Sequence, residues 1–459
     1  MGAIGDLPIP ARRSLAEASR HEAGGRLKEA AALFEAVAAA HPERHDVTHQ
    51  AGVVAAKRDL LPDAVALIEA ATKAAPEVSH YHRSLAELYR RQSRLDEALV
   101  QAREAIALDG ADAEAFYNLG VIHADRLEID DAVDALRRAL EFAPGHPGAH
   151  FELAECLLLT GRYEPGWEEF EWRFRLPGAR RPTPPGAVPA WNGEPLDGPL
   201  LVMADQGFGD VIQFARFLPL AAARCSQLLV IGSREVRPFL ANQHGVALCV
   251  DRWDALPPFA AHAVLSSLPR LFGTRPESIP APIPYLHADP ALAAQWRTKL
   301  DARLAPGLKR VGLVWAGRPA FGNDLGRALP LDALAPVAAL ESVALVSLQM
   351  GPARDQIARY GGRAPLIDLG AEIGDFNDTL AIVDGLDEVV SVDTGVAHLG
   401  GAMGRPVSIL LRYAADWRWG LGRSGSPWYP TATLYRQAIP NDWSAPVRAV
   451  AERLASGPA

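Results

Sequence analysis

The stretch "LLVMADQGFGDVIQFARFLPL", residues 200–220, places one carboxylate, Asp210, directly after a glycine-containing turn. The turn has only G-x-G, without the third glycine of a dinucleotide fingerprint or the lysine of a P-loop. Gln206, Gly207 and Gly209 are expected to form a tight loop that presents Asp210 at the start of a helix. An ionised carboxylate there can accept a proton from an attacking hydroxyl. Because Asp is also a favoured helix cap, the residue types alone leave catalysis and capping equally open.

A second stretch, "SVDTGVAHLGGAMGRPV" (391–407), ends an apolar run on Asp393, Thr394 and Gly395. Thr394 and Gly395 are expected to open a helix, whose free N–H groups and dipole suit a phosphate or diphosphate. His398 follows within the first turns of that helix, where it could contact a ligand or simply pack. The sequence therefore predicts a second polar strand end, directed at an anion.

Three further polar residues are candidates for binding the same ligand. Asn323 and Arg327 lie in the loop "FGNDLGRALPL" (321–331), and Gln349 ends the apolar run "VALVSLQM" (343–350). The chain contains no D-x-D pair, so we expect no metal, and no G-x-S-x-G nucleophile elbow, which disfavours a Ser-His-Asp hydrolase. No cofactor is expected either.

Short apolar runs separated by helical stretches predict the elements that position these residues. One set comprises residues 200–203, 228–231 and 247–250. A second set comprises residues 310–317, 343–350, 365–370, 388–393 and 406–411. This alternation predicts two parallel α/β domains of Rossmann-like type, residues 200–290 and 300–459, joined by a proline-rich passage at 276–290. Ligands bind outside the carboxyl ends of such strands, and both acidic stretches fall there.

The first third of the chain is periodic. Pro42, Pro76, Gly110 and Pro144 recur every 34 residues, and the same step relates three further columns. These columns are Leu27, Leu61, Leu95, Ile129 and Tyr163; Ala30, Ala64, Ala98, Ala132 and Gly166; and Ala18, Gly52, Ala86, Gly120 and Ala154. Small residues at fixed points let paired helices approach closely. The period and the pattern resemble tetratricopeptide repeats over residues 11–176.

Such a helical solenoid has no chemistry of its own, but its concave face binds extended protein segments. The first helix of each pair would line this groove with Tyr117, Asn118, Val121 and Phe151, among others. The repeats therefore predict a protein partner, with self-association as the alternative.

Residues 177–199 carry seven prolines and end the helical pattern, which predicts a semi-rigid linker. The net charge of −9 gives no electrostatic reason to expect nucleic acid as a partner. The first residues lack an apolar signal region, no apolar run is long enough to span a membrane, and the three cysteines form no C-x-x-C pair. A cytoplasmic, reduced protein is the expectation.

Four segments in fixed order carry a more specific resemblance. They are "GFGDVIQFARFLPL", "VGLVWAGRPAFGNDLGRALPL", "DFNDTLAIVDGLDEVVSVDTGVAHLGGAMGRPV" and "DWRW…SPWYP". Together they resemble the heptosyltransferase-type glycosyltransferases of family nine, and more closely the bacterial branch that joins tetratricopeptide repeats to this catalytic unit. The similarity spans nearly the whole chain, including "GRYEPGWEEFEWRF" at the end of the repeats.

The resemblance implies a GT-B fold, a nucleotide-sugar donor, no metal and inversion at the anomeric carbon. It matches Asp210 to the general base, and Asp393, Thr394, Gly395 and His398 to the donor-contacting motif. Arg327 stands where heptosyltransferases often have a basic residue near the donor phosphate. Relatives with this architecture resemble flagellin glycosyltransferases, which move a nonulosonic acid such as pseudaminic acid to Ser or Thr.

Three functions stay open on these grounds. The favoured one is a protein O-glycosyltransferase whose acceptor is recruited by the repeats. The second is a transferase acting on a cell-surface glycan or a lipid-linked saccharide. The third is a repeat scaffold with a non-catalytic transferase unit.

Overall fold

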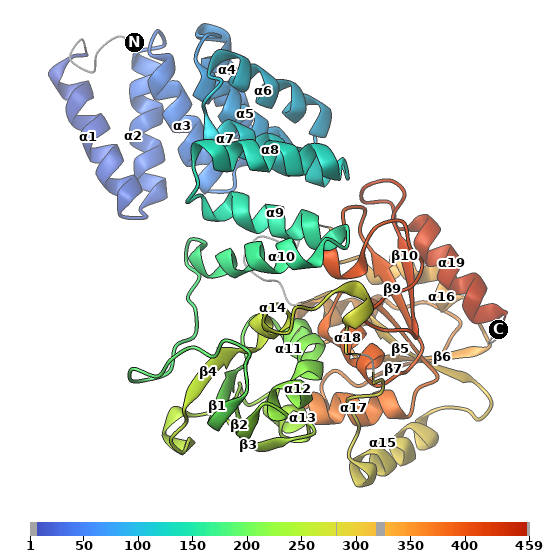
Figure 1. Cartoon of the computed structure of the whole chain (residues 1–459). Helices are drawn as coiled ribbons and strands as arrows, with labels where there is room; N and C mark the ends of the chain where they lie inside the picture. Colours follow the sequence, from blue (N-terminus) through green and yellow to red (C-terminus); the bar gives the residue numbers. More distant parts are fainter. Residues whose placement is uncertain (1–6, 281, 318–325, 457–459) are drawn as a thin grey trace. The chain divides into compact units, whose positions relative to one another are not determined.

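The computed structural model describes residues 7–280, 282–317 and 326–456 of the 459-residue chain (Figure 1). The chain forms two compact units. The first comprises Met1–Cys156 with Arg175–Pro177, and the second comprises Leu157–Phe174 with Gly178–Ala459. Residues Leu157–Phe174, which the repeat pattern places within the solenoid, thus belong to the compact unit that contains the α/β domains.

The predicted solenoid is confirmed as consecutive antiparallel helix pairs. The helices are α1 (Ile9–Ala23), α2 (Leu27–Ala40), α3 (His45–Lys57), α4 (Leu61–Ala74), α5 (Ser79–Arg91), α6 (Leu95–Leu108), α7 (Ala113–Asp125), α8 (Ile129–Phe142), α9 (Pro147–Leu159) and α10 (Tyr163–Phe170). The column that begins with Leu27 supplies the first residue of every second helix. The column of prolines and one glycine lies in the loops that separate successive pairs.

Small residues allow the paired helices to pack closely, as the sequence predicts. A Cβ added to Gly52 would lie 2.6 Å from Cγ1 of Ile68, and one added to Gly120 would lie 2.6 Å from Cγ of Leu136. Both distances are far shorter than ordinary van der Waals contact. Ala30 and the equivalent alanines of the following pairs have no exposed surface. The small columns are therefore contact points between helices.

The turn inside each pair shows a regularity that the sequence pattern did not reveal. One residue per turn has a positive φ, at the same 34-residue step. These residues are Gly25 (φ 73°), Asp59 (61°), Ser93 (59°), Leu127 (61°) and Gly161 (79°). Leu127 carries a branched apolar side chain in the left-handed region, where non-glycine residues are uncommon. Because the backbone conformation repeats while the residue type varies, composition could not identify this turn.

The first α/β domain, named acceptor-side after the substrate that the family resemblance implies for it, is a four-stranded parallel sheet in the order β3-β2-β1-β4. Its strands are β1 (Leu196–Met203), β2 (Cys225–Ile231), β3 (Val246–Val250) and β4 (Ala261–Val264). Its helices are α11 (Phe208–Phe214), α12 (Leu218–Ala222), α13 (Arg237–Ala241) and α14 (Leu268–Leu271). The three predicted strands are present, and β4 is an addition. Strand β1 begins within the segment predicted as linker.

The second α/β domain, named donor-side after the substrate that the family resemblance implies for it, is a six-stranded parallel sheet in the order β10-β9-β8-β5-β6-β7. Its strands are β5 (Lys309–Val314), β6 (Val343–Ser347), β7 (Leu366–Asp368), β8 (Glu388–Val392), β9 (Val407–Leu411) and β10 (Ala432–Arg436). Its helices include α15 (Pro290–Arg303), α16 (Ala335–Ala338), α17 (Phe376–Asp384), α18 (Gly395–Ala402) and α19 (Ser444–Ala455). All five predicted strands are present, and β10 was not predicted.

Helix α10 and the linker pack into the second unit. The indole N–H of Trp167 in α10 donates to the carbonyl of Thr274, 2.9 Å away. Trp191 of the linker packs edge-on against Phe272, with ring centroids 5.8 Å apart, and its backbone N–H donates to the carbonyl of His262. The last repeat helix and the linker thus form part of the support of the acceptor-side sheet.

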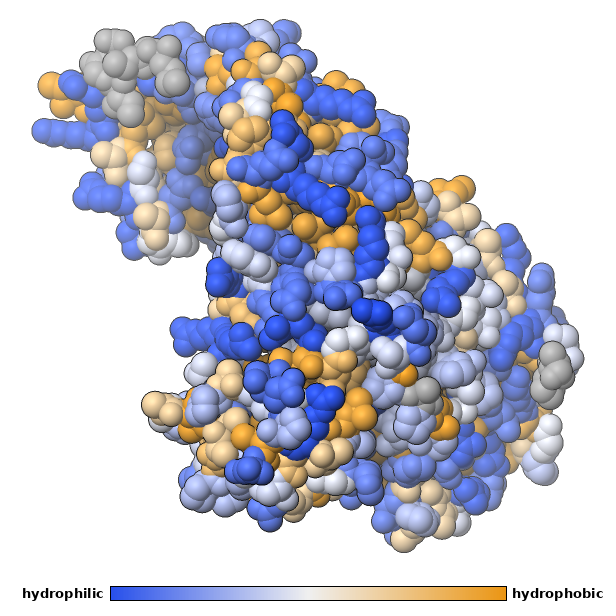
Figure 2. All heavy atoms as spheres, in the orientation of Figure 1, coloured by the Kyte–Doolittle hydropathy of each residue, from blue (hydrophilic) through white to orange (hydrophobic). Residues whose placement is uncertain are grey.

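Hydrophobic side chains are exposed at several places on the surface. On the face shown in Figure 2, hydrophobic residues lie scattered among hydrophilic ones. The exposed apolar side chains of the repeats include those of Ile9, Val100 and Phe142. No helix within the described ranges combines the length and apolar character that crossing a membrane requires.

Candidate functional site

Asp210 lies in the first turn of α11, directly after the carboxyl end of β1. Gly207 is the N-cap residue, and its N–H donates to Oδ2 of Asp210 at 3.0 Å. Arg418, from the donor-side domain, donates to the other oxygen, Oδ1. One oxygen therefore ties down the helix start, which confirms the capping role, and the other faces across the contact between the two domains. The catalytic role of Asp210 stays a prediction.

The turn before Asp210 uses its residues differently from the prediction. Gln206 takes the positive φ, 65°, whereas Gly207 has an ordinary φ of −75°. Gly209 is required for a different reason, because a Cβ there would lie 2.8 Å from Cδ2 of His398. The glycine thus permits α11 to approach the donor-side domain, rather than making the turn itself.

Asp393 follows β8 on the donor side and lies beside His398 of α18. Oδ1 of Asp393 and Nε2 of His398 are 3.7 Å apart, with side-chain exposures of 13% and 4%. Burial raises the pKa of Asp393, but hydrogen bonding to His398 and the charges of His398 and Arg418 outweigh burial and hold the pKa below its ordinary value. Asp393 is therefore held as a carboxylate in a confined polar environment.

His398 is part of the wall of the site. Its Nδ1 and the Tyr429 hydroxyl share a hydrogen bond of 2.9 Å, and its ring lies 5.2 Å from that of Trp419. The ring is thereby fixed, so that Nε2 is directed toward Asp393. His398 therefore both packs against aromatic rings and takes part in polar contacts.

Thr394 and Gly395 open α18 as predicted, but the threonine side chain points back to the strand. Its hydroxyl hydrogen-bonds Oγ of Ser391 at 2.9 Å and makes no cap bond to the helix. The first-turn N–H groups of an α-helix have no partner within the helix. A Cβ on Gly395 would lie 3.7 Å from the backbone nitrogen of Gly209. The start of α18 therefore meets the start of α11.

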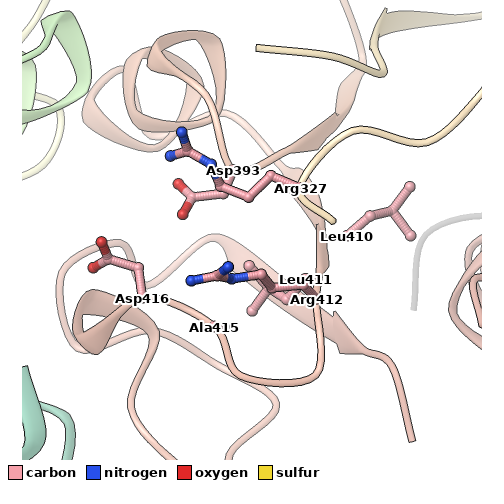
Figure 3. A pocket seen from close by; sticks show the side chains of 7 residues that line it. All are labelled: Arg327, Asp393, Leu410, Leu411, Arg412, Ala415 and Asp416. Atoms are coloured by element: carbon pink, nitrogen blue, oxygen red, sulfur yellow. The ribbon is translucent and has the colours of Figure 1, made fainter. Parts of the chain in front are cut away.

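A small pocket opens beside Asp393 at the carboxyl ends of β8 and β9 (Figure 3). It is lined by Arg327, Asp393, Leu410, Leu411, Arg412, Ala415 and Asp416. Figure 3 shows Arg327 extending beside Asp393, with Arg412 extending toward Asp416. The structure thus brings the predicted residues Arg327 and Asp393 together and adds a second arginine. Two guanidinium groups near a helix N-terminus can bind phosphate oxygens. Asn323 lies outside the described residues.

Gln349 lies at the carboxyl end of β6, but its amide is occupied by backbone groups. Its Oε1 accepts the N–H groups of Trp315 and Ala316 at 3.0 and 2.9 Å, and its Nε2 donates to the carbonyls of Ala316 and Met350 at 2.9 and 2.8 Å. Gln349 therefore joins the segments after β5 and β6. Its place in the structure is that of a brace, rather than of the donor contact the sequence predicts.

Sequence reasoning missed Arg418, which connects the two α/β domains at this site. Besides Asp210, its guanidinium donates to Gln213 of α11 and to Asp416, each at 2.6 Å. The residue lies in the "DWRW" segment that contributes to the family resemblance. That segment is the signal the sequence offers, but it does not indicate that Arg418 contacts the other domain.

The predicted groove residues of the repeats differ in how open they are. Tyr117 and Phe151 are half-buried, and the Tyr117 ring lies 4.8 Å from that of His146. Asn118 donates to the carbonyl of Arg83 at 3.3 Å, whereas Val121 is 8% exposed. Tyr117 and Phe151 are thus better placed to contact a partner than Val121, which packs inside the array.

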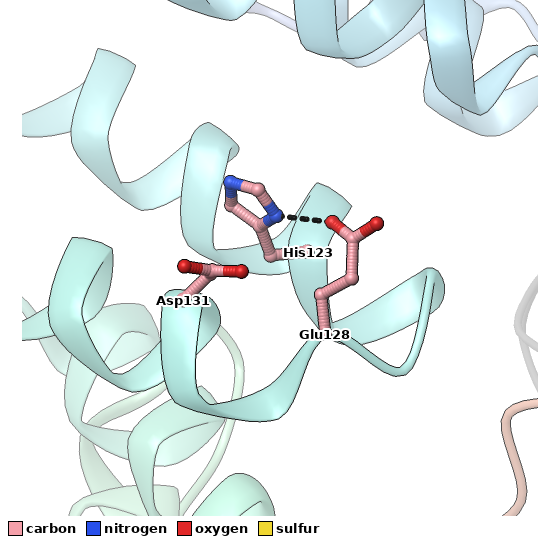
Figure 4. A group of neighbouring side chains, drawn as sticks. All are labelled: His123, Glu128 and Asp131. Atoms are coloured by element: carbon pink, nitrogen blue, oxygen red, sulfur yellow. Dashed lines mark hydrogen bonds and ion pairs between the residues drawn. The ribbon is translucent and has the colours of Figure 1, made fainter.

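One group of side chains in the repeats has the composition of a metal site (Figure 4). It comprises His123, Glu128 and Asp131, whose ligand atoms lie within 4.8 Å of one another. However, one oxygen of Glu128 bonds Nδ1 of His123 at 2.6 Å, and the other accepts Nε of Arg126 at 2.8 Å. Because the Arg126 guanidinium is bonded to Glu128, it would repel a metal cation at the same carboxylate. The hydrogen bonds of Glu128 instead stabilise the turn between α7 and α8.

Comparison with known proteins identifies the first region. The tetratricopeptide repeat family model matches residues 15–79, 49–113, 83–147 and 117–164. The chain therefore carries tetratricopeptide repeats, in agreement with the 34-residue period. Solved structures with similarity include MamA, from residue 41 to its end, of Desulfovibrio magneticus RS-1 (18% identical, 36% of this chain, 93% of that solved chain, TM-score 0.33). A thermophilic TPR protein in Thermus thermophilus is 21% identical, over 37% of this chain and 92% of its own, with a TM-score of 0.33.

A longer similarity links the chain to Protein FlbA of Caulobacter vibrioides. The two are 28% identical over 410 residues, which cover 81% of this chain and 66% of FlbA. The chain thus spans slightly less than two thirds of this relative. Because 81% of the chain is far more than the repeats occupy, the similarity extends into the α/β domains.

Proposed function

We propose that the protein is an inverting, metal-independent glycosyltransferase. It moves a sugar from a nucleotide-sugar donor to Ser or Thr of a protein acceptor recruited by the repeats. One observation supports this most directly: Asp210 and the Asp393–His398 pair come from different α/β domains and lie where the starts of α11 and α18 meet. A transferase needs such an arrangement, because donor and acceptor must meet between their binding domains.

In the proposed reaction, the acceptor hydroxyl oxygen attacks the anomeric carbon of the donor. The bond between that carbon and the phosphate oxygen breaks, and the nucleotide leaves with the bonding electrons. Asp210 accepts the hydroxyl proton. The N-terminus of α18, with Arg327 and Arg412, stabilises the negative charge on the departing phosphate. Asp393 orients the donor and fixes His398.

The acceptor is proposed to be a protein because tetratricopeptide repeats bind protein segments. Flagellin, modified with a nonulosonic acid such as pseudaminic acid, is the specific acceptor to which the motif resemblance points. Glycosylation before export would place the reaction in the cytoplasm. Tyr117 and Phe151 are the proposed acceptor contacts in the groove.

Intact-mass spectrometry of purified acceptors tests this function. Flagellin and cell-surface glycan acceptors are incubated separately with the protein and a panel of nucleotide sugars. A mass increase of one sugar on Ser or Thr of flagellin is expected. Transfer to the glycan alone would show that the acceptor is a glycan and not a protein. If no sugar transfer and no donor cleavage occur with any acceptor, the protein is a binding scaffold.

A further inference from the structure

Arg418 connects the two α/β domains through its side chain. It lies in the short 3-10 helix Trp417–Trp419 of the donor-side domain, and its side chain is 11% exposed. Its guanidinium reaches α11 of the acceptor-side domain, where it donates to Asp210 and to Gln213. One side chain thus joins the proposed base to the segment that follows the donor pocket.

The guanidinium is itself held in place from two sides. Asp416, which also lines the pocket, accepts two hydrogen bonds from Arg418, one from Nη1 at 2.6 Å and one from the backbone N–H at 3.0 Å. The Trp417 ring lies 4.7 Å from the guanidinium carbon, and Trp167 and Phe170 of α10 pack edge-on against Trp417. A guanidinium with this many partners has little rotational freedom.

These contacts determine how Asp210 is presented. Its Oδ2 accepts the Gly207 N–H from its own domain, and its Oδ1 accepts Arg418 from the other. Each carboxylate oxygen has two lone pairs, so a further proton can still be accepted. Without Arg418, the Gly207 N–H would be the remaining hydrogen-bond partner of the carboxylate among the described residues, and side-chain rotation could carry the basic oxygen away from the acceptor.

We infer that Arg418 is a positioning residue, which holds the carboxylate of Asp210 in its productive orientation when the two domains are in contact. This inference rests on the proposed glycosyl transfer. A direct role for Arg418 in binding the donor phosphate fits the geometry less well, because its guanidinium is committed to Asp210, Gln213 and Asp416.

The test compares Arg418→Gln, Arg418→Gly and the control Arg423→Gln in the full chain. Arg423 belongs to the same segment but is exposed. For Arg418→Gln, we expect kcat to fall about 10²-fold, the cost of a small misplacement of a catalytic group. Donor affinity and donor KM should stay at the wild-type values, and Arg423→Gln should match the wild type. Guanidinium ion, added far below denaturing concentrations, should restore part of the kcat of Arg418→Gly.

The outcomes separate this inference from the proposed function. An Arg418→Gln protein with unchanged kcat overturns the positioning role. The positioning role is also overturned if Arg418→Gln loses donor affinity and thermal stability along with kcat and guanidinium ion does not rescue Arg418→Gly, because that pattern describes a structural link between domains. If the wild-type protein itself transfers no sugar to any acceptor, the proposed function fails, and the positioning role fails with it.

Discussion

The two junctions β1–α11 and β8–α18 look alike in sequence but differ in structure. Each joins a parallel strand to a helix through a short segment, with a glycine and an acidic residue close to the start of the helix. In the first, Asp210 lies inside the helix, and its carboxylate contacts Gly207 and Arg418. In the second, Asp393 precedes the helix, and its carboxylate lies beside His398 with a lowered pKa.

The difference lies in what the two carboxylates have as partners. Asp210 bonds a backbone N–H and a side chain from the opposite domain, so its position depends on how the two domains meet. Asp393 bonds within its own domain, beside a pocket that contains two arginines. The first arrangement suits a group that acts on a second substrate, and the second suits a group that builds a binding pocket. Two carboxylates in similar local sequences can therefore have different roles, because the residues around them in the folded chain differ.

The largest effect on sugar transfer is expected from replacement of the proposed base, Asp210. Asp210→Asn keeps the size of the side chain and an oxygen for the Gly207 N–H, but it removes the basic carboxylate. We expect sugar transfer to slow by about 10²-fold or more, whereas donor affinity measured by calorimetry stays unchanged. Asp197→Asn is the matched control, because Asp197 is an exposed aspartate at the start of β1. If the folded Asp210→Asn protein transfers at the wild-type rate, Asp210 only stabilises the helix.

Deleting most of the repeats should impair recruitment of the acceptor and leave the β1–α11 and β8–α18 junctions intact. A deletion of residues 1–146 retains α9 and α10, which is necessary because Trp167 and Phe170 pack against Trp417 beside Arg418. Transfer to the folded acceptor should fall by about 10-fold or more, the loss expected when a tethered binding module is removed, while nucleotide affinity stays unchanged. A truncated protein that modifies its acceptor at the parental rate would show that the repeats have another role, such as self-association.

The sequence predicted those features that depend on local patterns. The repeat period, eight strands and the position of Asp393 at a strand end all follow from apolar spacing and small residues. Arg418 could not be predicted in the same way, because it acts through contacts with residues more than 200 positions away. Gln349 shows a related difficulty: from sequence alone, a polar residue at a strand end looks open to a ligand, whereas in the structure its amide bonds backbone groups. The left-handed turn at Leu127 has no compositional signal at all.

Removing the donor-side carboxylate should affect binding rather than the chemical step. Asp393→Ala leaves Nε2 of His398 without its acidic neighbour inside a buried site. We expect donor affinity to weaken by about 10-fold, equivalent to one hydrogen bond with a charged group. At saturating donor, kcat should change less than it does in Asp210→Asn. If Asp393→Ala keeps its donor affinity but loses kcat, the two junctions share one catalytic duty and the comparison is wrong.

The smallest effect is expected from chelation of metal ions. The proposed donor pocket is lined by two cationic groups suited to a phosphate, Arg327 and Arg412. Nucleotide affinity should therefore be the same with EDTA as with added magnesium or manganese. The alternative is a cation bridging Asp393 and Asp416, the two carboxylates that line the pocket. It is disfavoured because Asp393 pairs with His398 and Asp416 with Arg418. Binding that disappears in EDTA, together with loss of the metal effect in Asp393→Ala, would establish the bridge and replace the arginine-based account of the donor side.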